Sequence, residues 1–218
     1  MSAFQLSPED VRDLWRVLGV RYGFAVASKS GDRIAGTIGE WLARAGIVSA
    51  SDWQTRYATL LPLQRELGGP TVYVPFGLGV ATDLWPLEAQ FLVAVHEATH
   101  AYQYLRNPLG FVALYLGSSA DRANFEREAR AAAECVRWAL WGEVADPGAS
   151  TASLVTSYGC GIADAAVAAE DLRLDVLTIM AGGVVSPVAA FVCHWWRGRF
   201  APPPPPASPP SSPQPPPR

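Results

Sequence analysis

The stretch Leu87–Leu105 constrains the fold of this chain most, because it carries the motif His96–His100 (His-Glu-Ala-Thr-His) within an otherwise apolar segment. Its composition and periodicity predict a helix that begins near Pro86. Residues four positions apart lie on one face of a helix, so the two imidazoles would converge on one point. This His-Glu-x-x-His spacing predicts a metal site, with Glu97 directed at a metal-bound water.

The flanks of the motif predict that it is buried. From Phe91 to Leu105 the other side chains are mainly apolar, which is typical of a helix covered on most sides. Buried His and Glu side chains need partners, and a zinc ion with its bound water would satisfy all three. The alternative is a core helix whose histidines bond to backbone carbonyls and whose Glu97 meets an arginine. Gln103 would lie beside the ligand face, either hydrogen-bonded to a ligand or as a satisfied polar residue of the core.

A catalytic zinc takes three protein ligands and keeps one position open, so a third ligand must come from elsewhere. A helix predicted over Asp121–Trp141 carries the candidates. Glu126 follows His100 by 26 residues, and Glu128 is the next choice. These two carboxylates are about 200° apart around a helix and cannot share a face. The alternative for Glu126 is a surface ion pair with Arg130, one helical turn further on.

The motif at His96–His100, followed by Phe-Glu-Arg-Glu-Ala on the second helix, resembles the gluzincin branch of zinc metallopeptidases, especially the small minigluzincin domains. The resemblance extends over roughly Thr71–Trp141. It implies a zincin-like, mainly helical α+β fold, a Zn²⁺ cofactor, peptide or protein substrates and catalysis by Glu97. The second gluzincin signature often reads Glu-x-x-x-Asp, with the first Glu as a ligand. This implies Glu126 as the third ligand, while Arg130 stands where the Asp would be.

The remaining segments predict more helices and a little β-structure. The run Ser7-Pro8-Glu9-Asp10 is typical of a helix start, and Gly19 is the expected end of that helix. Thr71–Val74 has strand composition. Pro75 after it favours an edge strand just before the motif helix, to which an extended peptide could add as a further strand. Two further helices are expected, over Ile34–Ala45 and from Ser51 through Leu61.

Composition favours one globular domain. Hydrophobic residues make up 50 %, charged residues 17 %, and the net charge is −3 without a basic cluster, which excludes nucleic acid as an expected partner. Residues 1–199 are predicted to form a single zincin-like domain and residues 200–218 a disordered, proline-rich tail, which is either a ligand for partner modules or only a solubilising end. The irregular spacing of the three cysteines and the absence of a signal-peptide pattern favour a cytoplasmic location.

The segment Val176–Trp196 is nearly uncharged and about long enough to cross a membrane. Gly182-Gly183 interrupts it, and Ser186-Pro187 indicates the start of a new helix. Two short buried helices are therefore the favoured interpretation, and a membrane span is the alternative. His194 and Tyr158 are candidates for stabilising the oxyanion of a hydrolytic reaction.

Together these features predict a zinc-dependent peptidase that hydrolyses peptide bonds through a metal-activated water. His96, His100 and Glu126 would hold the zinc. Glu97 would take the proton from the water and pass it to the leaving amine. The alternatives are a non-catalytic, zinc-stabilised interaction module and a membrane-tethered peptidase. The presence of Glu97 favours an enzyme, because a structural zinc site needs no free carboxylate beside a ligand.

Overall fold

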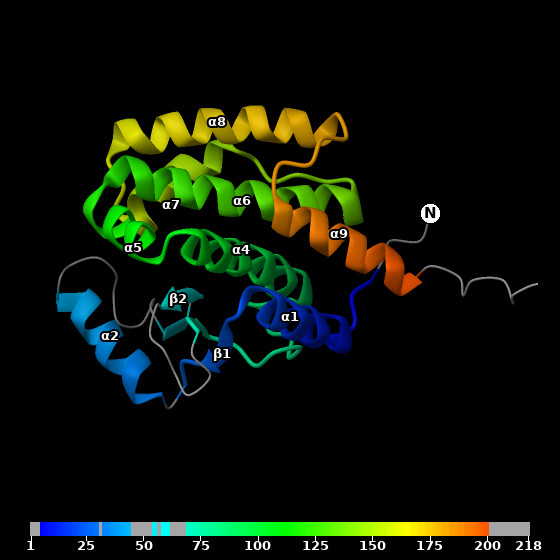
Figure 1. Cartoon of the computed structure of the whole chain (residues 1–218), viewed down its shortest axis with the longest axis horizontal. Helices are drawn as coiled ribbons and strands as arrows, with labels where there is room; N and C mark the ends of the chain where they lie inside the picture. The colour runs from blue at the N-terminus through cyan, green and yellow to red at the C-terminus, as the bar shows by residue number, and fades with distance from the viewer. Residues whose placement is uncertain (1–4, 31, 45–53, 56–57, 62–68, 201–218) are drawn as a thin grey trace, which may run out of the picture.

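The computed structural model describes residues 5–30, 32–44, 54–55, 58–61 and 69–200. Helices pack around the central helix α4, and a small sheet lies on one side of it (Figure 1). The prediction of a mainly helical α+β fold is confirmed. The elements in chain order are α1 (Pro8–Tyr22), β1 (Ala25–Ser28), α2 (Arg33–Arg44), β2 (Thr59–Leu61), β3 (Thr71–Val74), α4 (Leu87–Arg106), α5 (Pro108–Gly117), α6 (Ser119–Trp141), α7 (Gly148–Tyr158), α8 (Ile162–Met180) and α9 (Pro187–Phe200).

The sheet has the strand order β1-β3-β2. Strand β1 runs parallel to β3 with Ala25 opposite Thr71, and β2 runs antiparallel to it with Leu60 opposite Val72. β3 is therefore the central strand, and the prediction that it is an edge strand is wrong. Pro75 lies just beyond β3, where its missing N–H removes no hydrogen bond of the ladder. An added peptide strand would have to pair with β1 or β2 instead.

Two predicted helices have different outcomes. The helix expected over Ile34–Ala45 is confirmed as α2. The helix expected from Ser51 through Leu61 is wrong at its end, because residues 59–61 form β2. Short apolar runs suit a helix and a strand equally well, and here pairing with β3 decides. Residues 51–53 and 56–57 of this prediction lie outside the described residues.

Helix α1 begins at the predicted cap and ends one turn later than predicted. Ser7 Oγ accepts a hydrogen bond from the Asp10 N–H at 3.2 Å, and the Asp10 carboxylate accepts one from the Ser7 N–H at 2.9 Å. The helix continues past Gly19 because Gly23 takes the left-handed conformation (φ 62°) that terminates it. Gly19 is instead a point of close approach, since a Cβ there would lie 2.9 Å from the carbonyl oxygen of Phe24.

Helix α4 is the centre of the helical packing. It contacts α1, α5, α6 and α9, while α8 covers the far side of α6 (Figure 1). Phe91 of α4 meets Trp141 and Trp196 edge to face, with ring centroids 6.4 and 5.5 Å apart. A helix covered on several sides is expected to be apolar, so the polar side chains that α4 buries need a reason.

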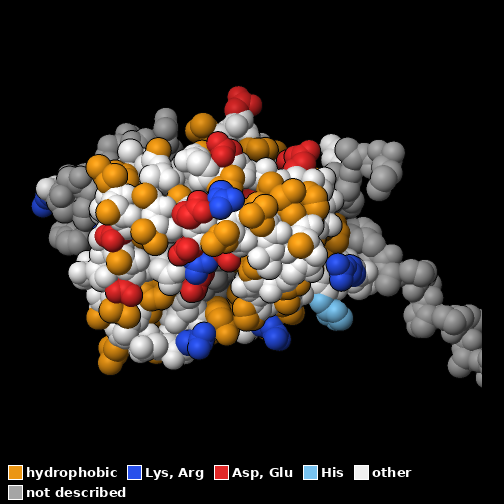
Figure 2. All heavy atoms as spheres, turned by 90° about the horizontal axis from the view of Figure 1, so that it is seen from above, with side chains coloured by type: hydrophobic (Ala, Val, Ile, Leu, Met, Phe, Trp, Pro, Cys, Tyr) orange, Lys and Arg blue, Asp and Glu red, His pale blue; other side chains and the backbone are white. Residues whose placement is uncertain are grey.

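The segment Val176–Trp196 belongs to two helices, as the favoured interpretation predicts. Helix α8 ends at Met180, and α9 begins at Pro187 after Gly182 has turned the chain with a φ of 89°. No helix within the described ranges is long and apolar enough to cross a membrane. Figure 2 looks onto the α8 face, where apolar side chains lie among acidic and basic ones. The predicted proline-rich tail lies outside the described residues from position 201 onward.

Candidate metal centre

Helix α4 carries both motif histidines and Glu97, and its first turn is fixed by Gln90. The buried amide of Gln90 accepts a hydrogen bond from the Gly79 N–H at 2.9 Å. It donates to the carbonyl oxygens of Val80 and Trp85 at 2.7 and 3.0 Å. These bonds hold the preceding loop against α4, and they explain why a polar side chain is fully buried in this helix.

Helix α6 brings Glu126 to the two histidines. The carboxylate oxygens of Glu126 lie 3.3 Å from His96 Nε2 and 3.2 Å from His100 Nε2, and the two Nε2 atoms are 3.1 Å apart. Glu128, the other candidate, lies on a different face of α6 and its side chain is 45 % exposed. It accepts a hydrogen bond from Gln103 at 3.0 Å. The structure therefore groups Glu126, and not Glu128, with the histidines.

The contacts that the non-metal alternatives predict are not found for Glu126, His100 or Glu97 among the described residues. Glu126 is fully buried and does not form a surface ion pair with Arg130, whose Nη2 donates to Ser153 Oγ at 2.9 Å. The ring nitrogens of His100 face Gln103 and Glu126 rather than backbone carbonyls. No arginine of the described residues forms an ion pair with Glu97, and its Oε2 has no hydrogen-bond partner among them.

The spacing of the three side chains fits a zinc ion. Zinc bonds of about 2.0–2.1 Å at tetrahedral angles place neighbouring ligand atoms about 3.3 Å apart. The two Nε2 atoms are 3.1 Å apart, and each lies at a similar distance from one oxygen of Glu126: His100 is 3.2 Å from Oε1 and His96 is 3.3 Å from Oε2. One ligand atom from each of the three residues lies within 4.8 Å of the others. Glu126 Oε2 is buried and, although it is at ion-pair distance from His96, it accepts no well-aligned hydrogen bond within the described residues. The group therefore suits three-ligand zinc with a fourth position left for water or substrate.

Gln103 determines which nitrogen of His100 faces the other ligands. The amide nitrogen of Gln103 donates to the carbonyl of Phe125 at 3.2 Å and to Glu128 at 3.0 Å. Its oxygen, which can only accept, lies 2.8 Å from His100 Nδ1, so that nitrogen carries a proton and Nε2 is left to face Glu126. The predicted hydrogen bond of Gln103 beside the ligands is confirmed. A metal-ligating histidine is commonly oriented in this way through its other ring nitrogen.

Burial and charge act against each other at the buried carboxylates. Burial raises the pKa of Glu97, and the neighbouring histidines offset this only in part. Burial acts in the same direction at Glu126, but the imidazoles of His100 and His96 outweigh it and hold the pKa of Glu126 well below its usual value. Burial also lowers the pKa of His100, yet the Glu126 carboxylate outweighs it and raises that pKa to about 9. Binding of a metal would therefore displace a proton from His100.

Tyr115 on α5 contacts the ligand Glu126, which the sequence did not predict. Its hydroxyl donates to Glu126 Oε1 at 2.5 Å, and its ring stacks against Phe125 at a centroid distance of 6.4 Å. Burial, with the Glu126 charge, raises the pKa of Tyr115 well above its usual value, so the hydroxyl keeps its proton. The only feature of the sequence that could have indicated this role is the single hydroxyl group among the otherwise apolar residues 111–116.

We expect Tyr115→Phe to lower zinc affinity about 10–100-fold, as is usual when a group that orients a metal ligand is lost. Competition with a chromophoric chelator measures the change. Tyr104→Phe is the matched control, because its ring packs against Phe111 at 6.3 Å and its hydroxyl makes no hydrogen bond with the described residues. Equal affinities for Tyr115→Phe and the wild type would show that the hydroxyl does not support Glu126.

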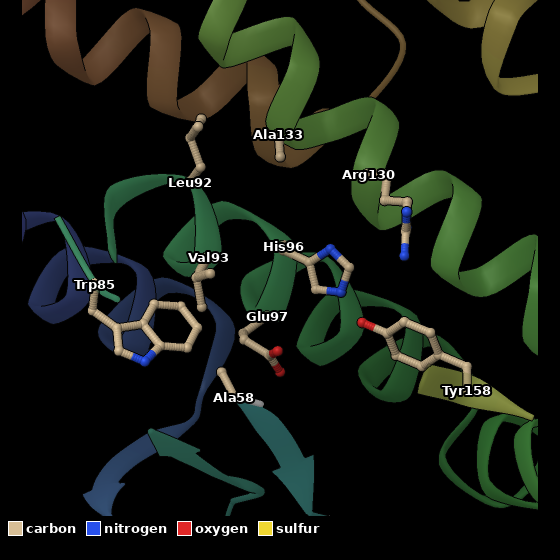
Figure 3. Close-up of a pocket in the computed structure, with 9 residues that line it drawn as sticks. All are labelled: Ala58, Trp85, Leu92, Val93, His96, Glu97, Arg130, Ala133 and Tyr158. Atoms are coloured by element: carbon tan, nitrogen blue, oxygen red, sulfur yellow. The ribbon is translucent and has the colours of Figure 1, made fainter. Parts of the chain in front are cut away.

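A pocket opens beside this group (Figure 3). His96 and Glu97 lie in its middle, Trp85 lies on one side, and Arg130 and Tyr158 lie on the other. The remaining lining residues are small or apolar: Ala58, Leu92, Val93 and Ala133. The side chain of His96 is 14 % exposed, so His96 can be reached from this pocket.

Only one of the two oxyanion candidates reaches the site. Tyr158, at the end of α7, lines the pocket, and its hydroxyl points toward His96 in Figure 3. Burial, with the Glu126 charge, raises the pKa of Tyr158 well above its usual value, so it remains a hydrogen-bond donor. His194 is exposed on α9 and does not line the pocket, because α9 packs through Phe191 and Trp196. The prediction for His194 is therefore wrong.

Two charged groups near the site were not predicted as part of it. Lys29, just after β1, is almost fully buried; burial lowers its pKa to about 7, and attraction to Glu97 offsets part of this effect. Arg130 lies one turn beyond Glu126 on α6 and enters the pocket. Lys29 is 68 residues away from Glu97 in the sequence, so no local pattern could have joined them.

Comparison of the chain with known protein families, with curated proteins and with solved structures gives no match. The resemblance to gluzincins therefore rests on the two short motifs.

Proposed function

We propose that this chain is a zinc-dependent metallopeptidase of the gluzincin type, with His96, His100 and Glu126 as the zinc ligands. The observation that carries the proposal is the state of Glu97. Its carboxylate is buried, one oxygen lacks a hydrogen-bond partner among the described residues, and it lines a pocket beside the three ligands. A buried carboxylate without a full set of partners is costly, and a general base directed at a reacting water gives it a purpose.

The residues of the pocket have separate roles in this proposal. Zinc, when bound, lowers the pKa of a water ligand toward neutrality and polarises the scissile carbonyl. Glu97 accepts the proton of the attacking water and delivers it to the leaving amine, and its raised pKa suits the second of these steps. Tyr158, protonated on the opposite wall, donates a hydrogen bond to the oxyanion. Tyr115 and Gln103 hold Glu126 and His100 in place.

A purely structural zinc site explains less of the geometry. It would account for the two histidines and Glu126, but structural zinc sites are usually closed by four protein ligands. Among the described residues the group has three such ligands, and a pocket leads to it. An interaction module would also leave the buried carboxylate of Glu97 without a role.

Metal removal tests the proposal. We expect the zinc-loaded protein to cleave members of a fluorogenic peptide library, to lose this activity with a zinc chelator and to regain it with one equivalent of Zn²⁺. Cleavage that survives full chelation would indicate a contaminating or metal-independent protease. A folded, zinc-loaded protein that cleaves no member of the library would contradict the proposed peptidase activity.

A further inference from the structure

Arg130 occupies a place in the pocket that the proposed chemistry leaves unused. It lies four residues after Glu126, so α6 projects both side chains toward the same region, and Figure 3 shows its guanidinium reaching down between His96 and Tyr158. Its Nη2 donates to Ser153 Oγ at 2.9 Å, and its guanidinium carbon lies 5.7 Å from the centre of the Tyr158 ring. These contacts hold the cation at the wall of the pocket.

The guanidinium has spare hydrogen-bonding capacity. It carries five N–H donors in a planar fork, and its Nε is buried without a hydrogen-bond partner in the described ranges. Within those ranges no Asp or Glu lies at ion-pair distance from it, whereas Arg127 and Arg137 on the same helix each have such a partner. A partly buried arginine without an anion is a suitable receptor for a carboxylate, which can take two of its N–H groups side by side.

The opposite side of the pocket has different chemistry. Trp85 and Val93 lie there, with His96 and Glu97 between them and Arg130 in Figure 3. An apolar side chain would be favoured against Trp85, because it removes apolar surface from water. An anionic group would be favoured at the other end. The pocket therefore has an apolar end at Trp85 and a cationic end at Arg130, with His96 and Glu97 between them.

We propose that Arg130 binds a carboxylate of the substrate and so selects peptides with an anionic group on the Tyr158 side of the scissile bond. The inference rests on the proposed peptidase function and names the class of substrate. The carboxylate is either the free C-terminus or an Asp or Glu side chain, since both present the same pair of oxygens. In either case Arg130 is a specificity-determining residue, and Glu97 and the zinc ligands perform the reaction without it.

Peptide binding, measured by calorimetry on the full-length Glu97→Gln protein, tests this inference apart from turnover. The first probe is the N-acetylated tetrapeptide Ala-Leu-Phe-Ala with a free C-terminus, compared with its C-terminal amide. The second pair consists of amidated peptides that end in Asp or in Asn. Each pair is titrated with and without zinc, so that direct binding of a carboxylate to the metal is separated from binding to Arg130.

We expect at least one carboxylate peptide to bind about 10–100-fold more tightly than its neutral partner, the range for a hydrogen bond to a charged group. Arg130→Met should abolish the preference and Arg130→Lys should retain part of it. Arg173→Met should leave it unchanged, because Arg173 is exposed on α8 and pairs with Glu170. A preference for the free C-terminus alone or for Asp alone supports the inference and identifies the source of the carboxylate.

Two results would overturn the assignment of Arg130: equal affinities within both pairs, or a preference that persists in Arg130→Met. Zinc content and thermal unfolding of Arg130→Met establish that the site and the fold are intact. Failure of the peptidase proposal looks different. In that case the zinc-loaded wild type would cleave no member of the fluorogenic peptide library, whatever the affinities of these four peptides.

Discussion

Glu97→Gln is expected to bind zinc as the wild type does and to hydrolyse peptides about 10²–10⁴-fold more slowly, the usual contribution of a positioned general base. The substitution keeps the size of the side chain and removes its ability to take up a proton. Glu97 is not one of the three grouped ligands, so the metal should stay. Zinc content by atomic spectrometry and kcat/KM on the same preparation measure both quantities.

The control for this prediction is Glu88→Gln, an exposed position in the first turn of the same helix. It makes the same chemical change away from the pocket and should leave both zinc content and turnover unaltered. Near-normal turnover in zinc-loaded Glu97→Gln would exclude Glu97 as the proton carrier. The interaction-module alternative predicts no hydrolysis by either protein and no functional change on Glu97→Gln.

Zinc is expected to raise the melting temperature of the wild type by about 8–16 °C when it is present at about 1,000 times its dissociation constant. Binding to the folded state alone contributes about 4 kcal/mol under that condition, and a domain of this size gains about 2–4 °C for each kcal/mol. Glu126→Gln should lose most of this increase, because the amide replaces a charged ligand. Each variant is compared with its own metal-free form, so the change in the apo protein cancels.

Glu128→Gln is the matched control on α6. It contacts Gln103 and not the grouped atoms, so we expect a loss of about 10-fold in affinity, which at the same zinc concentration leaves about 2.7 of the 4 kcal/mol. Differential scanning calorimetry with and without zinc measures the shift in all three proteins. If Glu128→Gln lost the stabilisation and Glu126→Gln kept it, the third ligand would be Glu128.

The sequence was most informative where the signal was local. The spacing of His96 and His100 within an apolar helix follows from helical periodicity, and α4 reproduces it. The same periodicity separates Glu126 from Glu128 on α6, but it does not say which of them faces α4. Packing of α4 against α6 decides that question, and it depends on contacts across the whole domain.

Features that depend on distant segments were not predictable from local patterns. Pro75 correctly marked the end of a strand, yet the place of β3 in the sheet depends on β1, which pairs with it from 46 positions earlier in the chain. Tyr115 and Arg130 carry no motif of their own. Tyr115 becomes part of the site because α5 passes beside Glu126. Arg130, which departs from the gluzincin signature, lies one turn after Glu126 on α6, and its role can be considered only once the structure shows that it lines the pocket.

The zinc content per chain of the purified, full-length protein, compared with that of His100→Ala and Glu126→Ala, tests the central claim most directly. We predict close to one zinc per chain in the wild type and a sharp loss in both variants, because each removes one of three converging ligands. Folded wild-type protein, prepared without chelator and supplied with Zn²⁺, that holds no zinc would contradict the metal centre and with it the proposed peptidase.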